Sequence, residues 1–176
     1  MLALLVLASG FVFVKFWLNR RRLRAGEGSA AQFLVVTRGG LRIADAVEVP
    51  WASVFGGVGC DLRSSGGRVA ARISRAAGVP EAEFVLGVRG VRELRDAAPS
   101  GVRGLFEVIG SHGGIRLPLD TLLAPDQVRP ALAAVAVAGR LAGARMVLSN
   151  DTGTVFRATT AVLGDPAAFA SGPGAA

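Results

Sequence analysis

The sequence has one cysteine, one histidine and no tyrosine among its 176 residues. The single cysteine, Cys60, excludes an intramolecular disulfide framework and a cysteine-based structural zinc site. The single histidine, His112, excludes any metal site that needs two imidazoles. With 24 glycines and 8 prolines, the chain does not suit a coiled coil or a long helical bundle. Its length allows one compact domain with a small addition.

Acidic side chains are also scarce, since 13 of them face 20 basic ones and leave a net charge of +7. The excess is concentrated near the N-terminus, where five basic residues precede position 25: Lys15, Arg20, Arg21, Arg22 and Arg24. The rest of the chain is close to neutral. Because it has no basic stripe interleaved with aromatic residues, we expect no nucleic-acid partner.

Residues 1–18 form an apolar stretch in which Lys15 is the only charged side chain. The four arginines follow directly after this stretch. A helix over residues 2–18 would be roughly 25 Å long, at the short end of what spans a hydrocarbon core of about 30 Å. Lys15 can extend its ammonium to the headgroups, and Trp17 suits the interface. The pattern predicts a transmembrane helix over residues 1–18, then a basic juxtamembrane segment and tether over residues 19–32. The basic cluster would set the topology and contact lipid headgroups.

The order of charges separates this anchor from its two alternatives, a cleavable signal peptide and a buried soluble helix. A signal peptide carries positive charge before its apolar core, whereas here the charge follows it. The positive-inside rule then places residues 19–176 in the cytoplasm and the N-terminus outside. We therefore expect a single-pass protein of the cell membrane whose lipid partners are contacted through the anchor.

Beyond the tether, the apolar pattern mostly has the period of two that is typical of strands. Short strands are predicted at residues 33–36, 41–43 and 47–51, the last at a sheet edge because Pro50 cannot donate to a ladder. The glycine-rich run at 54–62 predicts a strand with a bulge or a close backbone approach. A hairpin loop at 64–67 would return residues 68–73 as its partner.

The second half of the chain predicts an insertion over residues 74–104, with a strand at 83–88 and a short helix at 91–97. A hairpin follows at residues 105–119, then a helix that begins near Pro125. Its apolar stripe contains Val128, Leu132 and Val135, and Arg129 and Arg140 lie together on the opposite face. A second membrane span over 131–148 is disfavoured because Arg140 and Arg145 would enter hydrocarbon. A small hairpin at 146–163 and a disordered tail at 164–176 complete the prediction.

Several short strands followed by one amphipathic helix is also the order of a PH-like barrel. Three phrases resemble bacterial PH-like domains: the first hairpin FLVVTRGGLRIA, the strand end VPWASV at 49–54, and IRLPLDTL at 115–122 before the helix. The resemblance covers residues 33–142. It implies a mainly-β (α+β) PH-like barrel over 33–145, plugged by a C-terminal amphipathic helix and joined to the N-terminal transmembrane helix. No headgroup-binding motif transfers residue by residue.

Catalytic, cofactor and metal sites find little support in the sequence. His112 lies in a glycine-rich turn, and Cys60 has no basic neighbour that would make it a nucleophile. The glycines at 56–59 lack the ending of a phosphate loop. Acidic pairs at Glu81 and Glu83, and at Glu93 and Asp96, are typical of a solvated face. We therefore expect no catalytic residue, no cofactor and no metal.

The sequence thus favours a membrane-anchored cytoplasmic binding or scaffold module, an accessory subunit with a membrane or cytoplasmic protein partner. The candidate partner surface is either the strand edge around Pro50, which offers unpaired main-chain groups, or the helix face that carries Arg129 and Arg140, because forked guanidinium donors suit carboxylates. The first alternative is a lipid- or small-ligand-binding module at the inner leaflet. The second is an enzyme whose site lies in the insertion at 74–104.

Overall fold

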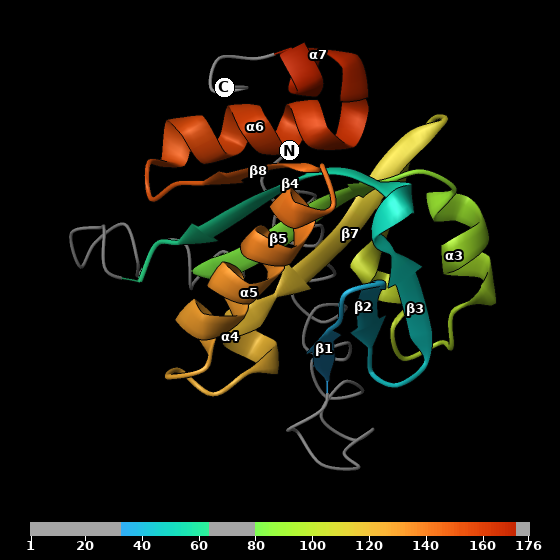
Figure 1. Cartoon of the computed structure of the whole chain (residues 1–176), viewed down its shortest axis with the longest axis horizontal. Coiled ribbons are helices and arrows are strands. Elements are labelled where there is room, and N and C mark those ends of the chain that lie inside the picture. Colours follow the sequence, from blue (N-terminus) through green and yellow to red (C-terminus); the bar gives the residue numbers. More distant parts are fainter. Residues whose placement is uncertain (1–32, 64–79, 172–176) are drawn as a thin grey trace, which may run out of the picture.

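The structure is a computed structural model that describes residues 33–63 and 80–171, and their strands form two sheets (Figure 1). The smaller sheet is antiparallel, in the order β1 (Leu34–Val36), β2 (Gly40–Ile43) and β3 (Val47–Pro50). The larger sheet has the order β6-β7-β5-β4-β8. Its strands are β4 (Val54–Asp61), β5 (Ala82–Val88), β6 (Phe106–Ile109), β7 (His112–Pro118) and β8 (Arg145–Leu148). Every neighbouring pair is antiparallel except β4 and β8, which run parallel.

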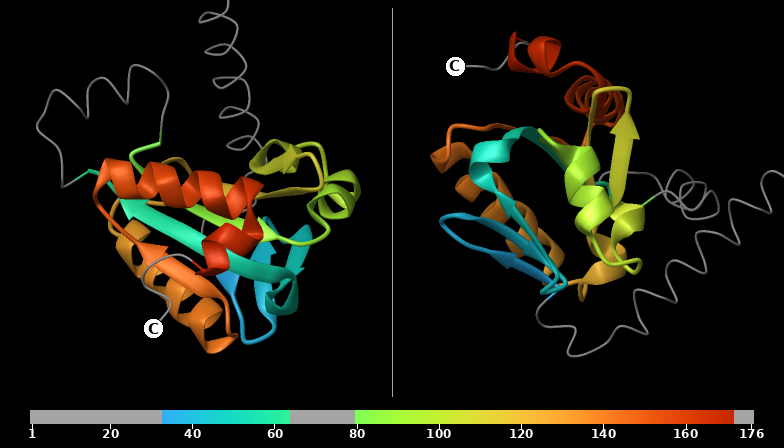
Figure 2. Two further views of the ribbon diagram at one scale, coloured as in Figure 1. Left: turned by 90° about the horizontal axis from the view of Figure 1, so that it is seen from above. Right: turned by 90° about the vertical axis from the view of Figure 1, so that its right-hand side faces the viewer.

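The helices cover both faces of the larger sheet. One face carries α5 (Val128–Leu141) and the smaller sheet, and the other carries α6 (Thr152–Gly164) and α7 (Pro166–Ser171), as the edge-on view in Figure 2 shows. The described residues also contain four shorter helical segments: η2 (Trp51–Ser53), α3 (Val91–Ala97), η3 (Arg103–Leu105) and α4 (Leu119–Leu122). A sheet covered on both sides needs apolar residues at successive positions, and β5 is buried from Phe84 to Val88.

The two faces have separate apolar cores. The α5 side is the larger and includes Phe84, Leu86 and Leu117 together with Leu132 and Val135 of the helix. The α6 side is smaller and consists of the following buried residues: Val58, Val85, Val162, Leu163 and Phe169.

Glycines of β4 let the α5 side pack closely. A Cβ on Gly57 would lie 2.7 Å from the Phe84 ring and 2.8 Å from Met146 Sδ, distances that real side chains do not adopt. The ladder between β4 and β5 also shifts between Val54 and Gly56. The bulge and the close approach that the glycine-rich run predicts are therefore both confirmed.

Most local elements agree with the sequence pattern. β3 lies at an edge of its sheet, with Val47 and Val49 buried and Glu48 and Pro50 exposed. The β6–β7 hairpin and α3 form where they are predicted. α5 begins at Val128 rather than at Pro125, and it packs on the sheet through its predicted apolar stripe instead of forming a second membrane span.

The predicted PH-like barrel is wrong. Neither sheet closes: β8, which the chain reaches after α5, pairs in parallel with β4 and leaves β6 and β8 as the two edges of an open sheet. α5 then lies on a face of that sheet rather than in the end of a barrel. The fold is mixed α/β with two sheets.

Three boundaries of the domain prediction also change. The hairpin expected at 146–163 is a strand, β8, followed by helix α6, and α7 occupies residues 166–171 of the expected disordered tail. The expected insertion contributes β5, which lies at the centre of the larger sheet and takes the place beside β4 expected for residues 68–73.

The predicted transmembrane helix over residues 1–18, the tether, the loop at 64–67 and residues 68–73 lie outside the described residues. Across residues 33–63 and 80–171, no helix combines the length and the apolar character needed to cross a membrane.

Candidate functional site

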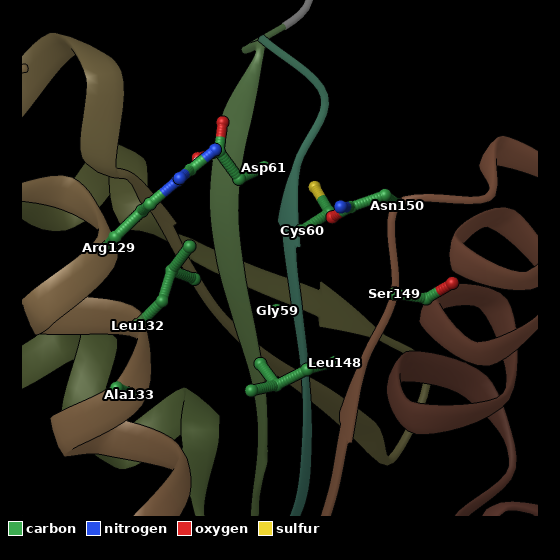
Figure 3. Close-up of a pocket in the computed structure, with 9 residues that line it drawn as sticks. All are labelled: Gly59, Cys60, Asp61, Arg129, Leu132, Ala133, Leu148, Ser149 and Asn150. Carbon is green, nitrogen blue, oxygen red and sulfur yellow. The ribbon is translucent and has the colours of Figure 1, made fainter. Parts of the chain in front are cut away.

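A groove of about 500 Å³ opens where β4, α5 and β8 come together at one end of the larger sheet (Figure 3). β4 forms its floor, the first half of α5 forms one wall, and the end of β8 with the loop after it forms the other. Its lining consists of Gly59, Cys60, Asp61, Arg129, Leu132, Ala133, Leu148, Ser149 and Asn150.

The groove exists because β4 is longer than its parallel neighbour. The pairing of β4 with β8 ends at Gly59 and Leu148, and the last bond between them runs from the Ser149 N–H to the Gly59 carbonyl at 3.1 Å. The chain then turns away into α6, whose first turn is capped by the Asp151 carboxylate accepting from the Thr154 N–H at 2.7 Å. β4 continues for two more residues, and on that side no strand within residues 33–63 and 80–171 pairs with them.

Asp61, the last residue of β4, is the buried charged side chain of the site, with 8% of its side chain exposed. Its Oδ1 accepts from Arg63 Nε at 2.8 Å and its Oδ2 from Arg63 Nη2 at 3.0 Å, a two-bond fork. Arg129 of α5 donates from Nε to the same Oδ2 at 3.1 Å. One carboxylate thus joins the end of β4 to the first turn of the helix.

These bonds determine the charge of the site. The hydrogen bonds from Arg63 and Arg129 lower the pKa of Asp61 from 3.8 to about 2, although burial acts in the opposite direction. The partnership raises the pKa of Arg63 in turn, with smaller contributions from Asp120 and Glu81. The carboxylate is therefore ionised at neutral pH and held by two cations.

Cys60 borders the groove but does not suit nucleophilic chemistry. Its side chain is buried, and desolvation, assisted by the negative charge of Glu83, raises the pKa of its thiol to about 11. The thiolate is therefore scarce at neutral pH. This agrees with the inert thiol that the sequence predicts.

The other titratable residues singled out in the sequence lie elsewhere. His112 is exposed in the β6–β7 hairpin, at the opposite edge of the sheet. Glu83 bonds to Arg116 at 3.2 Å, and burial raises the pKa of its carboxyl. Glu93 and Asp96 lie on the short helix α3. No three histidine, cysteine or acidic side chains gather as a metal site within the described ranges.

The two arginines predicted as a partner surface have different surroundings. Arg129 lines the groove with 69% of its side chain exposed. Arg140, about 16 Å further along α5, donates from Nη2 to the Met146 carbonyl of β8 at 3.0 Å. The topogenic cluster, Lys15, Arg20, Arg21, Arg22 and Arg24, lies outside the described residues.

Of the residues that line the groove, only Arg129 is predicted from the sequence as a functional residue. Asp61 follows a buried apolar strand directly, a position at which a charged residue signals either a partner or a site. Ser149 and Asn150 read as an ordinary turn. No local pattern could connect these residues with Arg129, because β4, α5 and β8 are far apart in the chain. Comparison with protein-family models, curated proteins and solved structures finds no match to this chain.

Proposed function

We propose that the protein is a binding module at the cytoplasmic face of the cell membrane and that it holds a partner protein in the groove between β4, α5 and β8. The observation that supports this is the groove itself: about 500 Å³, with an ion-paired floor and aliphatic walls. It borders an unreactive thiol and no imidazole of the described chain, so its chemistry suits recognition rather than catalysis.

Site-specific crosslinking tests this function. A benzoylphenylalanine replaces Ala133, which lines the groove, or Ala134, which is exposed one residue further along the same helix but does not line it. After irradiation of cells that make the full chain, we expect one discrete protein adduct from position 133 and none from position 134. Equal adducts from both positions, or none from 133, would contradict the proposal.

A small ligand of the inner leaflet is the second candidate, because the groove volume falls within the range of about 300–1,000 Å³ typical of small-molecule sites. The same experiment separates the two. A lipid or metabolite adduct at position 133, without a protein adduct, would support the small-ligand module instead.

The location at the membrane rests on the apolar stretch of residues 1–18 and the basic residues around its end. A fluorescent reporter that matures only in the cytoplasm, fused after Ala176, should be bright and should sediment with membranes. A dark reporter, or a bright one in the soluble fraction, would contradict this location.

A further inference from the structure

The main-chain N–H and C=O of Asp61 point toward the groove. Along β4, the Leu62 N–H points to β5, where it bonds to the Glu81 carbonyl at 2.7 Å, whereas the Gly59 carbonyl points to β8. Successive strand residues alternate in direction, so the N–H and C=O of Asp61 point the same way as those of Gly59. Neither has a hydrogen-bond partner among the described residues, because β8 has already ended. Unpaired groups of this kind on a strand are a template for one more residue of extended chain.

An incoming chain cannot run through this groove. The place beside Gly59 that it would enter next is already occupied by Leu148 and Ser149. In an antiparallel pair, one residue exchanges both main-chain bonds with its opposite residue. A chain antiparallel to β4 could pair with Asp61 in this way and would then meet the end of β8, so it has to terminate there. Its terminus in that direction is a carboxylate.

The side chains around this position favour a carboxylate over an amine. Both oxygens of Asp61 already accept from arginines, so the site has no carboxylate to spare for an ammonium group. The Arg129 guanidinium and the Asn150 amide border the groove as donors. Ser149 Oγ accepts from the Asp151 N–H at 3.1 Å and points toward α6, away from the groove (Figure 3), so it is not counted among these donors. Leu132, Ala133 and Leu148 supply apolar walls.

We propose that the groove binds the carboxyl-terminal end of a partner polypeptide: its last residue pairs with the main chain of Asp61, its aliphatic side chain lies between Leu132 and Leu148, and its carboxylate lies near Arg129 and Asn150. This inference rests on the proposed function and names the chemistry of the partner. It differs from an internal strand addition in requiring a free chain end.

Peptide binding to the full chain in detergent micelles tests the inference. The probes are fluorescein-labelled hexapeptide pools, random at five positions and ending in leucine, valine, aspartate or lysine, each made as a free acid and as an amide. Fluorescence polarisation should show that the leucine and valine acids bind at least tenfold more tightly than their amides and than the aspartate and lysine pools. Equal affinity of acids and amides, or no binding of any pool, would overturn the inference.

Two variants locate the binding in the groove. Ala133→Trp should abolish peptide binding, whereas Ala134→Trp on the same helix should leave it unchanged. Arg129→Gln should weaken the free acids at least fivefold and the amides less than twofold. If Arg129→Gln weakens both forms equally, the carboxylate is not beside Arg129 and the assignment fails.

Amide hydrogen exchange gives a readout that does not depend on a variant. The Asp61 N–H should exchange more slowly when the leucine-ending acid is bound, and unchanged exchange in a saturated sample would overturn the pairing with β4. If position 133 gives a protein adduct but no peptide pool binds, this inference is overturned and the proposed function still stands. If position 133 also gives no protein adduct, both the inference and the proposed function are contradicted.

Discussion

At the scale of single residues, Asp61 connects segments that are far apart in the sequence. Its two oxygens bind Arg63, which follows it in the chain, and Arg129, which belongs to α5. Arg63 in turn donates to the Pro125 carbonyl at 3.1 Å, just before that helix begins. A buried carboxylate is stable only when its charge is met in this way, so the cluster both orders the groove and holds α5 to the sheet.

The low pKa of Asp61 makes stability dependent on pH. Because the folded-state pKa is about 2 and the ordinary value is 3.8, the ionised form is favoured by folding. The contribution, about 2 kcal/mol, is present above pH 4 and is lost as the pH falls toward 2. Urea unfolding of Asp61→Asn and the natural chain should therefore give a stability gap at pH 6 that narrows at pH 2.5. The control is Asp45→Asn, since Asp45 forms an exposed pair with Arg42 and its loss should cost less than about 0.5 kcal/mol.

Arg116 shows why a strand pattern alone does not predict a surface charge. The alternation of β7 places it opposite the apolar residues, which suggests a solvated side chain. In the structure it donates to Glu83 and to Glu107, on the face of the sheet that carries α6. Its replacement by aspartate would put a third carboxylate beside Glu83 and Glu107.

Leu117→Ala and Ile109→Ala form a matched pair of variants on the β6–β7 hairpin. Leu117 is fully buried in the core on the α5 side of the larger sheet, whereas Ile109 is 43% exposed at the end of β6. Truncation of the buried leucine should lower the free energy of unfolding by about 2–5 kcal/mol, and truncation of the exposed isoleucine by less than about 1 kcal/mol. Chemical denaturation measures both, and similar losses would contradict the assigned register.

At the scale of secondary-structure elements, β4 depends on glycine where its face meets α5. The Phe84 ring and Met146 Sδ occupy the space that a side chain at Gly57 would need. Glycine has a lower intrinsic preference for strands than larger residues have, but only glycine allows this close packing.

Gly57→Ala should therefore destabilise the protein by about 1–3 kcal/mol through overpacking, although alanine suits a strand better than glycine does. The matched control is Gly101→Ala, because a Cβ at Gly101 meets nothing within 4 Å. Thermal melting followed by circular dichroism should show a clear decrease for the first variant and little change for the second. An unchanged melting temperature for Gly57→Ala would show that Phe84 and Met146 can move aside.

At the scale of the whole molecule, the larger sheet is stable only when both faces are covered. α6 supplies the second cover through Val162 and Leu163, which pack on Val58 and Val85. The same helix leaves Phe156 72% exposed on its outer side. The packing of α6 on the sheet thus depends on a few buried residues rather than on the overall apolar character of the helix.

Val162→Ser should lower the free energy of unfolding by about 2–4 kcal/mol, because it removes buried methyl groups and buries a hydroxyl. Phe156→Ser on the same helix should change it by less than about 1 kcal/mol. Urea denaturation with a dye that binds exposed apolar surface measures both effects. Equal sensitivity at the two positions would contradict the packing of α6 on the sheet.

What the sequence by itself determined about this protein is local. The alternation of β3, the β6–β7 hairpin and the apolar stripe of α5 each follow from a repeat shorter than about ten residues, which the backbone geometry of strands and helices imposes. An inert Cys60 is likewise predicted from its lack of a basic neighbour, although in the structure it is burial, with Glu83 of β5, that raises the pKa of the thiol. Each of these predictions needs no knowledge of distant segments.

The tertiary structure alone decided the pairing of β8 with β4 and, with it, the fold and the groove. The turn residues between two strands of a hairpin indicate that the strands pair. Parallel strands are joined by a long connection, and no sequence signal in it indicates their pairing. β8 is short, and the turn-forming residues that follow it, Asn150, Asp151 and Gly153, suit a hairpin as well as the start of a helix, so the local pattern favoured the wrong element there. Arg129 and Asp61 meet only because this pairing places α5 across the end of β4. The site is therefore a property of contacts distant in sequence, and these depend on burial on both faces of one sheet rather than on any local repeat.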